Sequence, residues 1–282
     1  MRTAPWIGPL LLLCLAAPTH AARPTPGAPS TPEQREAAWQ QHQQMRNASI
    51  FKGLSWRSIG PTGQGGRVVD LASVPGQPYT FYVAYATGGV WKTTNNGGSF
   101  EPLTDQLPNT VIGAIAVDPS KPETLWIGAG EPNAARSNYG GHGVFVSHDG
   151  GKSFARKGLT GTDRIAEILV DPRDSRRVLV AAAGKLYSPG GQRGVFLTED
   201  GGDTWTQVLK PNDNWTGASD LVIDPTRPDV LYAALWTRTR TPWQFTESGD
   251  GSGIYKSEDG GRSWRQLSGG LPQGDSVGRI GL

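Results

Sequence analysis

The chain has little of what several protein classes depend on. Its only cysteine is Cys14, within an apolar N-terminal run, so disulfides cannot stabilise the remaining chain. Charged residues make up 18% of the sequence, the formal net charge is +2, and no block of Lys or Arg is present. We therefore expect no nucleic-acid partner. The apolar run is too short to span a bilayer, so we expect no transmembrane segment in the mature chain.

Patterns for metal and cofactor chemistry are also missing. There is no H-E-x-x-H pair and no phosphate-binding glycine loop. Beyond the N-terminal run only His42, His142 and His148 remain, and they form no ligand pattern. The loop Asp250–Gly253 lacks the spacing of an EF-hand. The sequence therefore predicts neither a metal nor a cofactor.

Residues 1–21 are organised as an export signal. Arg2 precedes an apolar core over residues 7–17, and small residues permit cleavage near Ala21. We therefore expect an exported protein, either periplasmic or secreted.

Residues 22–52 form the second predicted segment, a Pro/Gln-rich leader. Within it, Thr31 and Gln34 have the spacing of a capping box, and Pro32 occupies the first helical position. The pattern predicts a short helix from Pro32 to about Arg46.

One eight-residue pattern recurs four times, starting at residues 93, 147, 198 and 257. It consists of a hydroxyl residue, any residue, Asp or Asn, Gly or Asn, Gly, any residue, Ser or Thr, and Trp or Phe. The Asp or Asn side chain can close a turn, the glycines accept positive φ, and the final aromatic residue buries apolar area. We interpret these positions as structural: Asn95, Asp149, Asp200 and Asp259.

Apolar runs recur in step with these turns and predict four short strands, A to D, in each repeat. Three A runs end in Asp-Pro, at Asp118, Asp171 and Asp224, and a second apolar run begins seven residues after each Asp. Repeats of four strands are typical of β-propeller blades. Residues 53–282 are therefore predicted to form an all-β propeller of four-stranded antiparallel blades.

The ends of this region predict an incomplete ring of about four blades. Leu54–Ile59 resembles an outgoing D strand that would close the ring, and residues 278–282 begin a fifth repeat. We therefore expect further blades C-terminal to Leu282.

Candidate ligand-binding residues lie in the loops between strands B and C, whose lengths vary while the A–B spacing is constant. Variable loops on a constant scaffold commonly carry recognition. These loops span residues 131–142, 184–193 and 236–252, and a D–A connection adds Trp215. The predicted ligand-binding residues are Glu131, Asn133, Arg136, Tyr139, His142, Trp215 and Trp243. The alternative is that the loop aromatics only stabilise their own loops.

Carboxyl residues recur at one position of strand A: Asp70, Glu167 and Asp220. Strand A lines the channel of a propeller, so the three side chains would gather near its mouth. Two carboxyl groups can cleave a glycosidic bond as acid and base. The alternative is that these acids accept neighbouring backbone N–H groups.

The repeated turns, the Asp-Pro motifs, Trp56–Pro61 and Gly88–Lys92 together resemble the Asp-box, or BNR, repeats of sortilin/VPS10-type propellers. They are also similar to exported bacterial proteins described as glycosyl hydrolase or sortilin-like. Such relatives include receptors, assembly factors, xyloglucan-cleaving enzymes and sialidases. In xyloglucan-cleaving relatives an Asp precedes a Gly-Gly pair by two residues, where this chain has Ala86.

These observations favour an exported propeller that binds a peptide, protein or glycan on its B–C/D–A loop face. The alternative is a glycoside hydrolase, xyloglucanase- or sialidase-like, whose catalytic candidates are Asp70, Glu167 and Asp220.

Overall fold

The computed structural model describes residues 30–54 and 66–282. Its one α-helix, α1 (Pro32–Ala48), starts at the expected proline, and Thr31 and Gln34 form the predicted capping box. The predicted export signal and the predicted closing strand at Leu54–Ile59 lie wholly or almost wholly outside the described residues.

Sixteen strands form four antiparallel sheets, each with its strands in sequence order. The first two sheets consist of β1 (Val68–Val74), β2 (Gln77–Tyr85), β3 (Gly89–Thr93) and β4 (Glu101–Pro102), and of β5 (Ile112–Val117), β6 (Leu125–Ala129), β7 (Val144–Ser147) and β8 (Ala155–Arg156). The third consists of β9 (Ile165–Asp171), β10 (Asp174–Ala182), β11 (Gly194–Thr198) and β12 (Thr206–Leu209). The fourth consists of β13 (Thr216–Ile223), β14 (Leu231–Thr237), β17 (Gly253–Ser257) and β18 (Arg265–Gln266). A hairpin of β15 (Thr239–Arg240) and β16 (Phe245–Thr246) projects from the last sheet.

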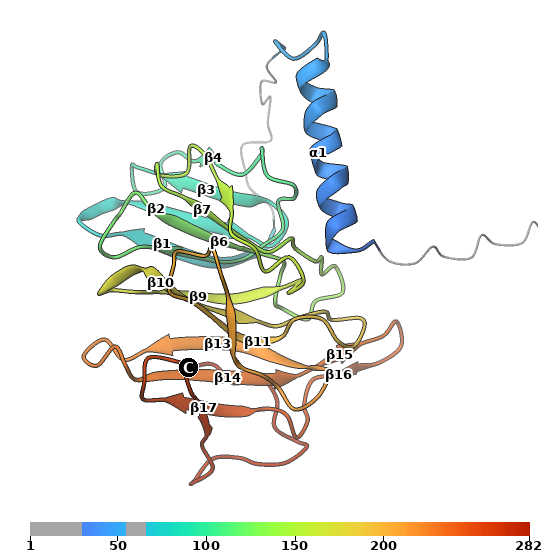
Figure 1. Cartoon of the computed structure of the whole chain (residues 1–282), viewed down its shortest axis with the longest axis vertical. Helices are drawn as coiled ribbons and strands as arrows, with labels where there is room; N and C mark the ends of the chain where they lie inside the picture. The colour runs from blue at the N-terminus through green and yellow to red at the C-terminus, as the bar shows by residue number, and fades with distance from the viewer. Residues whose placement is uncertain (1–29, 55–65) are drawn as a thin grey trace, which may run out of the picture.

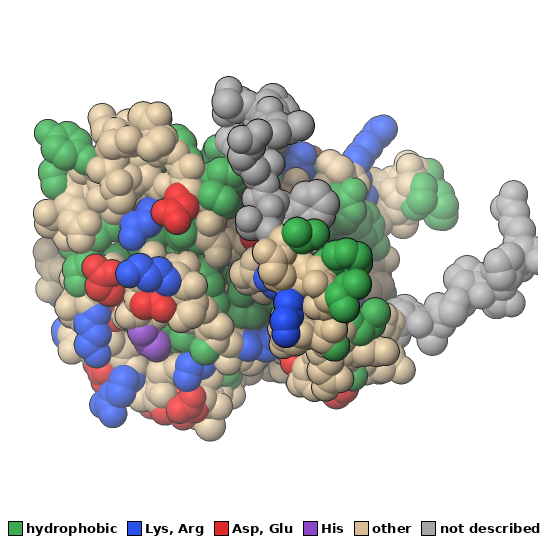
Figure 2. Space-filling model, turned by 90° about the horizontal axis from the view of Figure 1, so that it is seen from above, with side chains coloured by type: hydrophobic (Ala, Val, Ile, Leu, Met, Phe, Trp, Pro, Cys, Tyr) green, Lys and Arg blue, Asp and Glu red, His purple; other side chains and the backbone are tan. Residues whose placement is uncertain are grey.

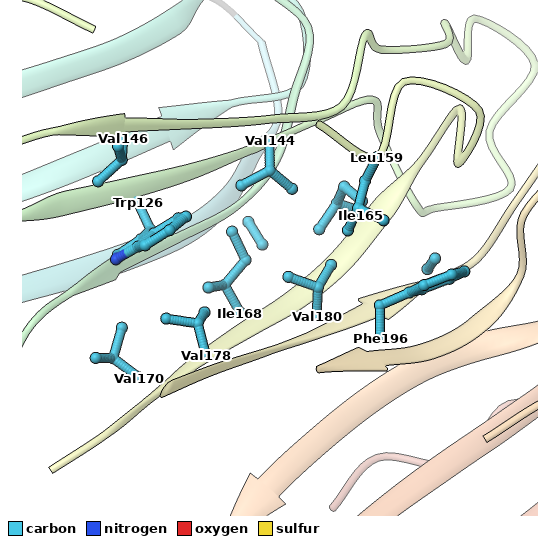
Figure 3. Packing of buried hydrophobic residues seen from close by; sticks show 12 residues of the cluster. Trp126, Val144, Val146, Leu159, Ile165, Ile168, Val170, Val178, Val180 and Phe196 are labelled. Atoms are coloured by element: carbon cyan, nitrogen blue, oxygen red, sulfur yellow. The ribbon is translucent and has the colours of Figure 1, made fainter. Parts of the chain in front are cut away.

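The sheets pack face to face because their central strands are apolar on both sides. In β10, Val178 and Val180 pack toward the second sheet, whereas Leu179 and Ala181 pack toward the fourth. Figure 3 shows the first of these layers, where Trp126 and Val146 of the second sheet meet Val178 of the third. A strand buried on both faces has no polar alternation, which explains the continuous apolar runs in the sequence.

The first strands of successive sheets, β1, β5, β9 and β13, contact one another, and the sheets stack along the long axis of the molecule (Figure 1). Four-stranded sheets that pack face to face, with their first strands together, are arranged as propeller blades. The fold is a partial β-propeller of four blades with a short N-terminal helix, as the sequence predicts.

The repeated turns and the long loops lie at opposite ends of the blades. In the third blade, Thr198 pairs with Val178 where the repeated turn begins, and Gly194 pairs with Ala182 at the other end, beside the B–C loop. The second blade has the same register, since Ser147 pairs with Leu125. The constant and variable parts of each repeat therefore face away from each other.

Each repeated turn is closed by its own side chains. Ser147 Oγ donates to Asp149 Oδ1 at 2.7 Å and accepts the Gly151 N–H at 2.8 Å. Asp149 also accepts the backbone N–H of Ser153 at 2.9 Å. Gly150 and Gly151 have φ of 72° and 93°, a region that glycine enters without steric cost. These bonds hold the pKa of Asp149 well below its usual range, with the Ser153 hydroxyl as the first cause.

The turns are also attached to their own blades in a regular way. The fourth residue of each turn donates its N–H to a backbone carbonyl that lies in the second strand of that blade or two residues before it. The four bonds are Asn96 to Tyr79, Gly150 to Glu123, Gly201 to Arg176 and Gly260 to Asp229.

Helix α1 lies against the first blades (Figure 1). Arg35 donates to the Thr160 carbonyl, and Glu36 forms an ion pair with Arg156. On the face of the molecule shown in Figure 2, acidic and basic side chains are interspersed. That mixture agrees with a formal net charge of only +2.

Candidate functional site: the B–C loop face

Three B–C loops meet around a pocket of about 420 Å³. The second blade contributes Arg136, the third contributes Tyr187, and the fourth contributes residues 240–245, which include the turn between β15 and β16. Trp243 at the hairpin tip is 83% exposed, and Tyr187 is 49% exposed. Aromatic faces are thus presented to solvent by loops that are far apart in the sequence.

Contacts between the loops fix this arrangement. The guanidinium of Arg240 lies 4.9 Å above the Phe245 ring, and the same group donates to the Ala134 carbonyl in the second blade's loop. The Tyr187 hydroxyl donates to the Arg136 carbonyl at 3.2 Å. Each blade's loop therefore supports the loop of another blade.

Buried arginines hold the loops from below. Arg193 donates to five carbonyl oxygens, those of Ala183, Lys185, Ser188, Gly190 and Trp215. Arg238 is 1% exposed and donates to the Pro132 carbonyl of the second blade. Burial, with repulsion from neighbouring arginines, lowers the pKa of Arg238 to about 9, and burial lowers the pKa of Arg193 to about 10. Both groups remain cationic at neutral pH, so positive charge accumulates beneath this face.

Three of the predicted ligand-binding residues make contacts within the loop scaffold. The carboxylate of Glu131 is fully buried and accepts two hydrogen bonds from Arg67, at 2.8 and 2.7 Å. Asn133 Oδ1 accepts from Arg279 at 2.8 Å. The half-buried Trp215 uses its carbonyl to accept from Arg193 at 2.8 Å. These contacts position the loops.

Tyr139 and His142 line two further hollows of the same face. Tyr139 is 56% exposed and borders a hollow of about 510 Å³ beside Tyr187. His142 is 4% exposed and lines a hollow of about 530 Å³ beneath α1, together with Trp39 and Asp163. Burial lowers the pKa of His142, and the Arg35 charge lowers it further, so the imidazole is neutral at pH 7.

The three channel carboxyl groups lie on neighbouring inner strands but differ in their partners. Asp70 accepts the Ile115 N–H of the next blade at 2.7 Å, and Asp220 accepts the Leu282 N–H at 2.9 Å. Within the described residues, Glu167 accepts only the N–H of the next residue, Ile168, at 3.0 Å. Among the described residues, Glu167 thus has no bond to an adjacent blade like the one that Asp70 makes.

The pKa of Glu167 is strongly raised. Burial raises its pKa to about 8, and the charges of Asp70 and Asp220 contribute in the same direction. Burial also raises the pKa of Asp70, against its two backbone hydrogen bonds. At neutral pH Glu167 is therefore a protonated carboxylic acid, which is the state a general acid requires.

Two features were not recognised from the sequence. The ion pair between Arg67 and Glu131 joins residues 64 positions apart. The sequence did contain a signal for Arg67, because Arg67 and Arg164 each precede a channel carboxyl residue by three positions. The pattern Gly274–Gly278 has the spacing G-x-S-x-G, but it lies in a turn without the flanking strand and helix of a hydrolase elbow.

The fold is similar to that of several known proteins. Residues 142–273 match the Sortilin-Vps10 family, described as sortilin, neurotensin receptor 3. The chain is 22% identical over 222 residues to a probable oligoxyloglucan-reducing end-specific xyloglucanase of Neosartorya fischeri, covering 76% of this chain and 25% of that protein. It is 23% identical over 214 residues to the oligoxyloglucan-reducing end-specific xyloglucanase of Emericella nidulans, covering 73% and 24%.

Among solved structures, a GH74 enzyme described as ancestral superposes with a TM-score of 0.59 and 25% identity, covering 78% of this chain and 26% of that one. The GH74 xyloglucanase from Xanthomonas campestris gives a TM-score of 0.50 and 19% identity, covering 75% and 32%. The chain therefore spans about a quarter of the length of the curated relatives it matches. These likenesses support the propeller fold and relate the chain to glycoside hydrolases at a distance.

Two further features are absent from the described part of the chain. Within residues 30–54 and 66–282, no helix combines the length and apolarity needed to cross a bilayer. The same residues contain no group of three or more His, Cys, Asp or Glu arranged to hold a metal ion.

Proposed function

We propose that this chain is the glycan-binding part of an exported propeller that acts on polysaccharide, with the loop face holding the sugar chain and Glu167 donating a proton. One observation carries the proposal. An exposed aromatic pocket and a protonated carboxyl group occur at the same end of the same blades. The similarity to xyloglucanases supports it.

The pocket suits a sugar ring. A pyranose has apolar C–H faces and polar edges, and Trp243 and Phe245 provide apolar ring surfaces beside the polar groups of Arg136 and Gln244. Ligand sites commonly combine an apolar surface with a few polar groups that fix orientation. The long, exposed loop tips suit a polymer that extends beyond one sugar.

The three carboxyl groups can supply the two catalytic roles that glycoside cleavage requires. Glycoside cleavage requires one carboxylic acid that protonates the leaving oxygen and one carboxylate that acts as base or nucleophile. Glu167 matches the acid because it is protonated at neutral pH. Asp70 and Asp220, which each accept two backbone N–H bonds, are the candidates for the second role. Because this chain has Ala86 where xyloglucan-cleaving relatives have an Asp, we assign the role of general acid to Glu167 instead.

Release of reducing ends from a panel of plant and microbial polysaccharides tests this function. Glu167→Gln removes the transferable proton with little change in shape and is expected to abolish release. Glu258→Gln is the matched control, because Glu258 is exposed at the opposite end of the blades and pairs with Lys256. Equal activity of the two variants would contradict the proposal.

Binding without catalysis is the second candidate, with a peptide, protein or glycan as ligand. The observation that favours it is that Asp70 already accepts the N–H of Ile115 in β5, and Asp220 accepts the N–H of Leu282. Combined replacement of Arg136, Tyr139 and Trp243 by alanine is expected to abolish capture of a ligand on this face. Capture without any release of reducing ends would decide for this candidate.

The remaining assignments belong to the same proposal. Residues 1–21 are the export signal, residues 22–52 the leader, and residues 53–282 the propeller. The repeated turns are Asp-boxes with a structural role, and their carboxylates are not part of the ligand site. Sequencing the N-terminus of the secreted protein tests the cleavage near Ala21.

A further inference from the structure

The ionic character of the pocket differs from that of the surrounding surface. Its lining contains two guanidinium groups, Arg136 and Arg240, together with Tyr187, Trp243 and Phe245. None of its lining residues is a carboxylate. Elsewhere on the described surface basic groups are commonly paired with acids, as in the pairs of Arg173 with Asp229 and Arg262 with Glu199.

Two carboxylates of the neighbouring loops are already held by other arginines. Glu131, the carboxylate of the second blade's loop, is fully buried and bound by Arg67. Asp163 is bound by Arg164, whose guanidinium lies 5.6 Å from the Tyr187 ring centroid. Arg238 is buried beneath the loops with carbonyl oxygens as its partners. The site therefore retains an excess of positive charge, as a site that attracts an anion does.

The geometry of the two arginines suits a planar anion. Arg240 is held by the Phe245 ring and the Ala134 carbonyl, so its guanidinium is fixed in position. Arg136 is exposed and comes from a different blade. A guanidinium binds a carboxylate through paired N–H groups, and an ordered one loses little freedom on binding.

We propose that the pocket selects an acidic glycan, in which a uronic acid carboxylate lies between Arg136 and Arg240 while the sugar ring stacks on Trp243. This inference rests on the proposed glycan function and narrows it, because xyloglucan is not the substrate that two unneutralised arginines would favour. An acidic peptide would use the same charges, but the exposed ring surfaces favour a pyranose face.

Binding of the full chain to a matched pair of polymers tests the inference. Polygalacturonate and its fully methyl-esterified form share a backbone and differ in charge. We expect the acid form to bind at least about tenfold more tightly, as hydrogen bonds to charged groups imply. The preference should shrink at about 0.5 M salt, where the Debye length is only a few ångströms.

Variants assign the preference to this pocket. Arg136→Gln should remove most of it, and Trp243→Ala should weaken binding of both polymers. The matched control is Arg262→Gln, at the opposite end of the blades, which should leave binding unchanged. Because Arg240 also supports the loop, Arg136→Gln is the decisive variant, and an unchanged melting temperature verifies its fold.

The outcomes separate this inference from the function on which it rests. Equal, Trp243-dependent binding of both polymers would overturn the acidic preference and leave glycan binding intact. No binding to either polymer, or to a neutral panel, would overturn both. Tighter binding of poly-glutamate than of polygalacturonate would overturn the assignment to a glycan. Binding to dextran sulfate but not to polygalacturonate would replace the carboxylate by a sulfate ester and overturn the uronic acid.

Discussion

Asp70 of the first blade accepts the backbone N–H of Ile115 in the second blade at 2.7 Å. This bond joins two adjacent inner strands through a side chain, because strands of different blades do not share a hydrogen-bond ladder. Asp220 accepts the N–H of Leu282, which lies after the last strand, at 2.9 Å. An acid at this position can therefore hold blades together, whatever other role it has.

The Asp70 contact predicts a measurable stability effect. Asp70→Ala leaves the Ile115 N–H without its partner and should lower the free energy of unfolding by about 1–3 kcal/mol. Urea unfolding measures this loss, with Asp105→Ala as the control because Asp105 is exposed. Equal unfolding midpoints for the two variants would show that the bond contributes nothing.

The raised pKa of Glu167 predicts a pH dependence. The folded group has a pKa of about 8, against an ordinary value of 4.5. Below pH 4.5 Glu167 is protonated in both the folded and the unfolded protein, so it does not reduce the free energy of unfolding. As the pH rises toward 8, Glu167 ionises only in the unfolded protein, so the free energy of unfolding falls. The total loss is at most roughly 5 kcal/mol. Glu167→Gln should therefore become more stable relative to wild type between pH 5 and 8.

Urea unfolding at several pH values measures that difference. Glu258→Gln serves as control, and its stability should run parallel to wild type across the same range. If the stability of Glu167→Gln also changes with pH in parallel with wild type, Glu167 is ionised in the folded protein.

A Ser→Ala replacement in a repeated turn should lower stability without changing glycan binding. Ser147 is 1% exposed, donates to Asp149 and accepts the Gly151 N–H. Ser147→Ala leaves that buried N–H unpaired and should cost about 1–3 kcal/mol. The exposed Ser268 provides the Ser→Ala control, with an expected change within about 0.5 kcal/mol. Glycan binding should be the same in both variants, because the turn lies at the far end of the blade.

Two tryptophans provide a matched comparison. Trp205 packs edge to face on Trp126 of the preceding blade and donates to the Lys157 carbonyl at 2.6 Å. Trp205→Ala should cost roughly 3 kcal/mol. Trp243 is 83% exposed, so Trp243→Ala should leave stability nearly unchanged and weaken glycan binding. Calorimetry measures the stability of both variants, and titration measures their glycan binding. A loss of stability in Trp243→Ala together with a loss of binding in Trp205→Ala would refute the placement of the ligand site at the loop end of the blades.

Local patterns were sufficient for the fold. Apolar runs in register with a repeated turn predicted four-stranded blades, and the structure has them. The helix start was also predicted, because Thr31, Pro32 and Gln34 interact within one turn. Such signals are readable because the interacting groups are close in sequence.

The site was predicted less completely. The variable loops indicated the face on which the pocket lies, and they include the pocket residue Trp243. Sequence alone did not separate side chains that face solvent from those that hold the loops. Glu131 and Trp243 are both loop residues with large side chains, yet one is fully buried and the other 83% exposed.

By itself, the sequence determined that the chain forms repeated antiparallel blades with constant turns at one end and variable loops at the other, because strand and turn preferences act over a few residues. Only the tertiary structure decided which of these loop residues meet and which carboxyl group is protonated. Arg67 and Glu131 are 64 residues apart, and Asn133 and Arg279 are 146 apart. The pKa of Glu167 depends on burial and on charges contributed by other blades, which no local pattern encodes.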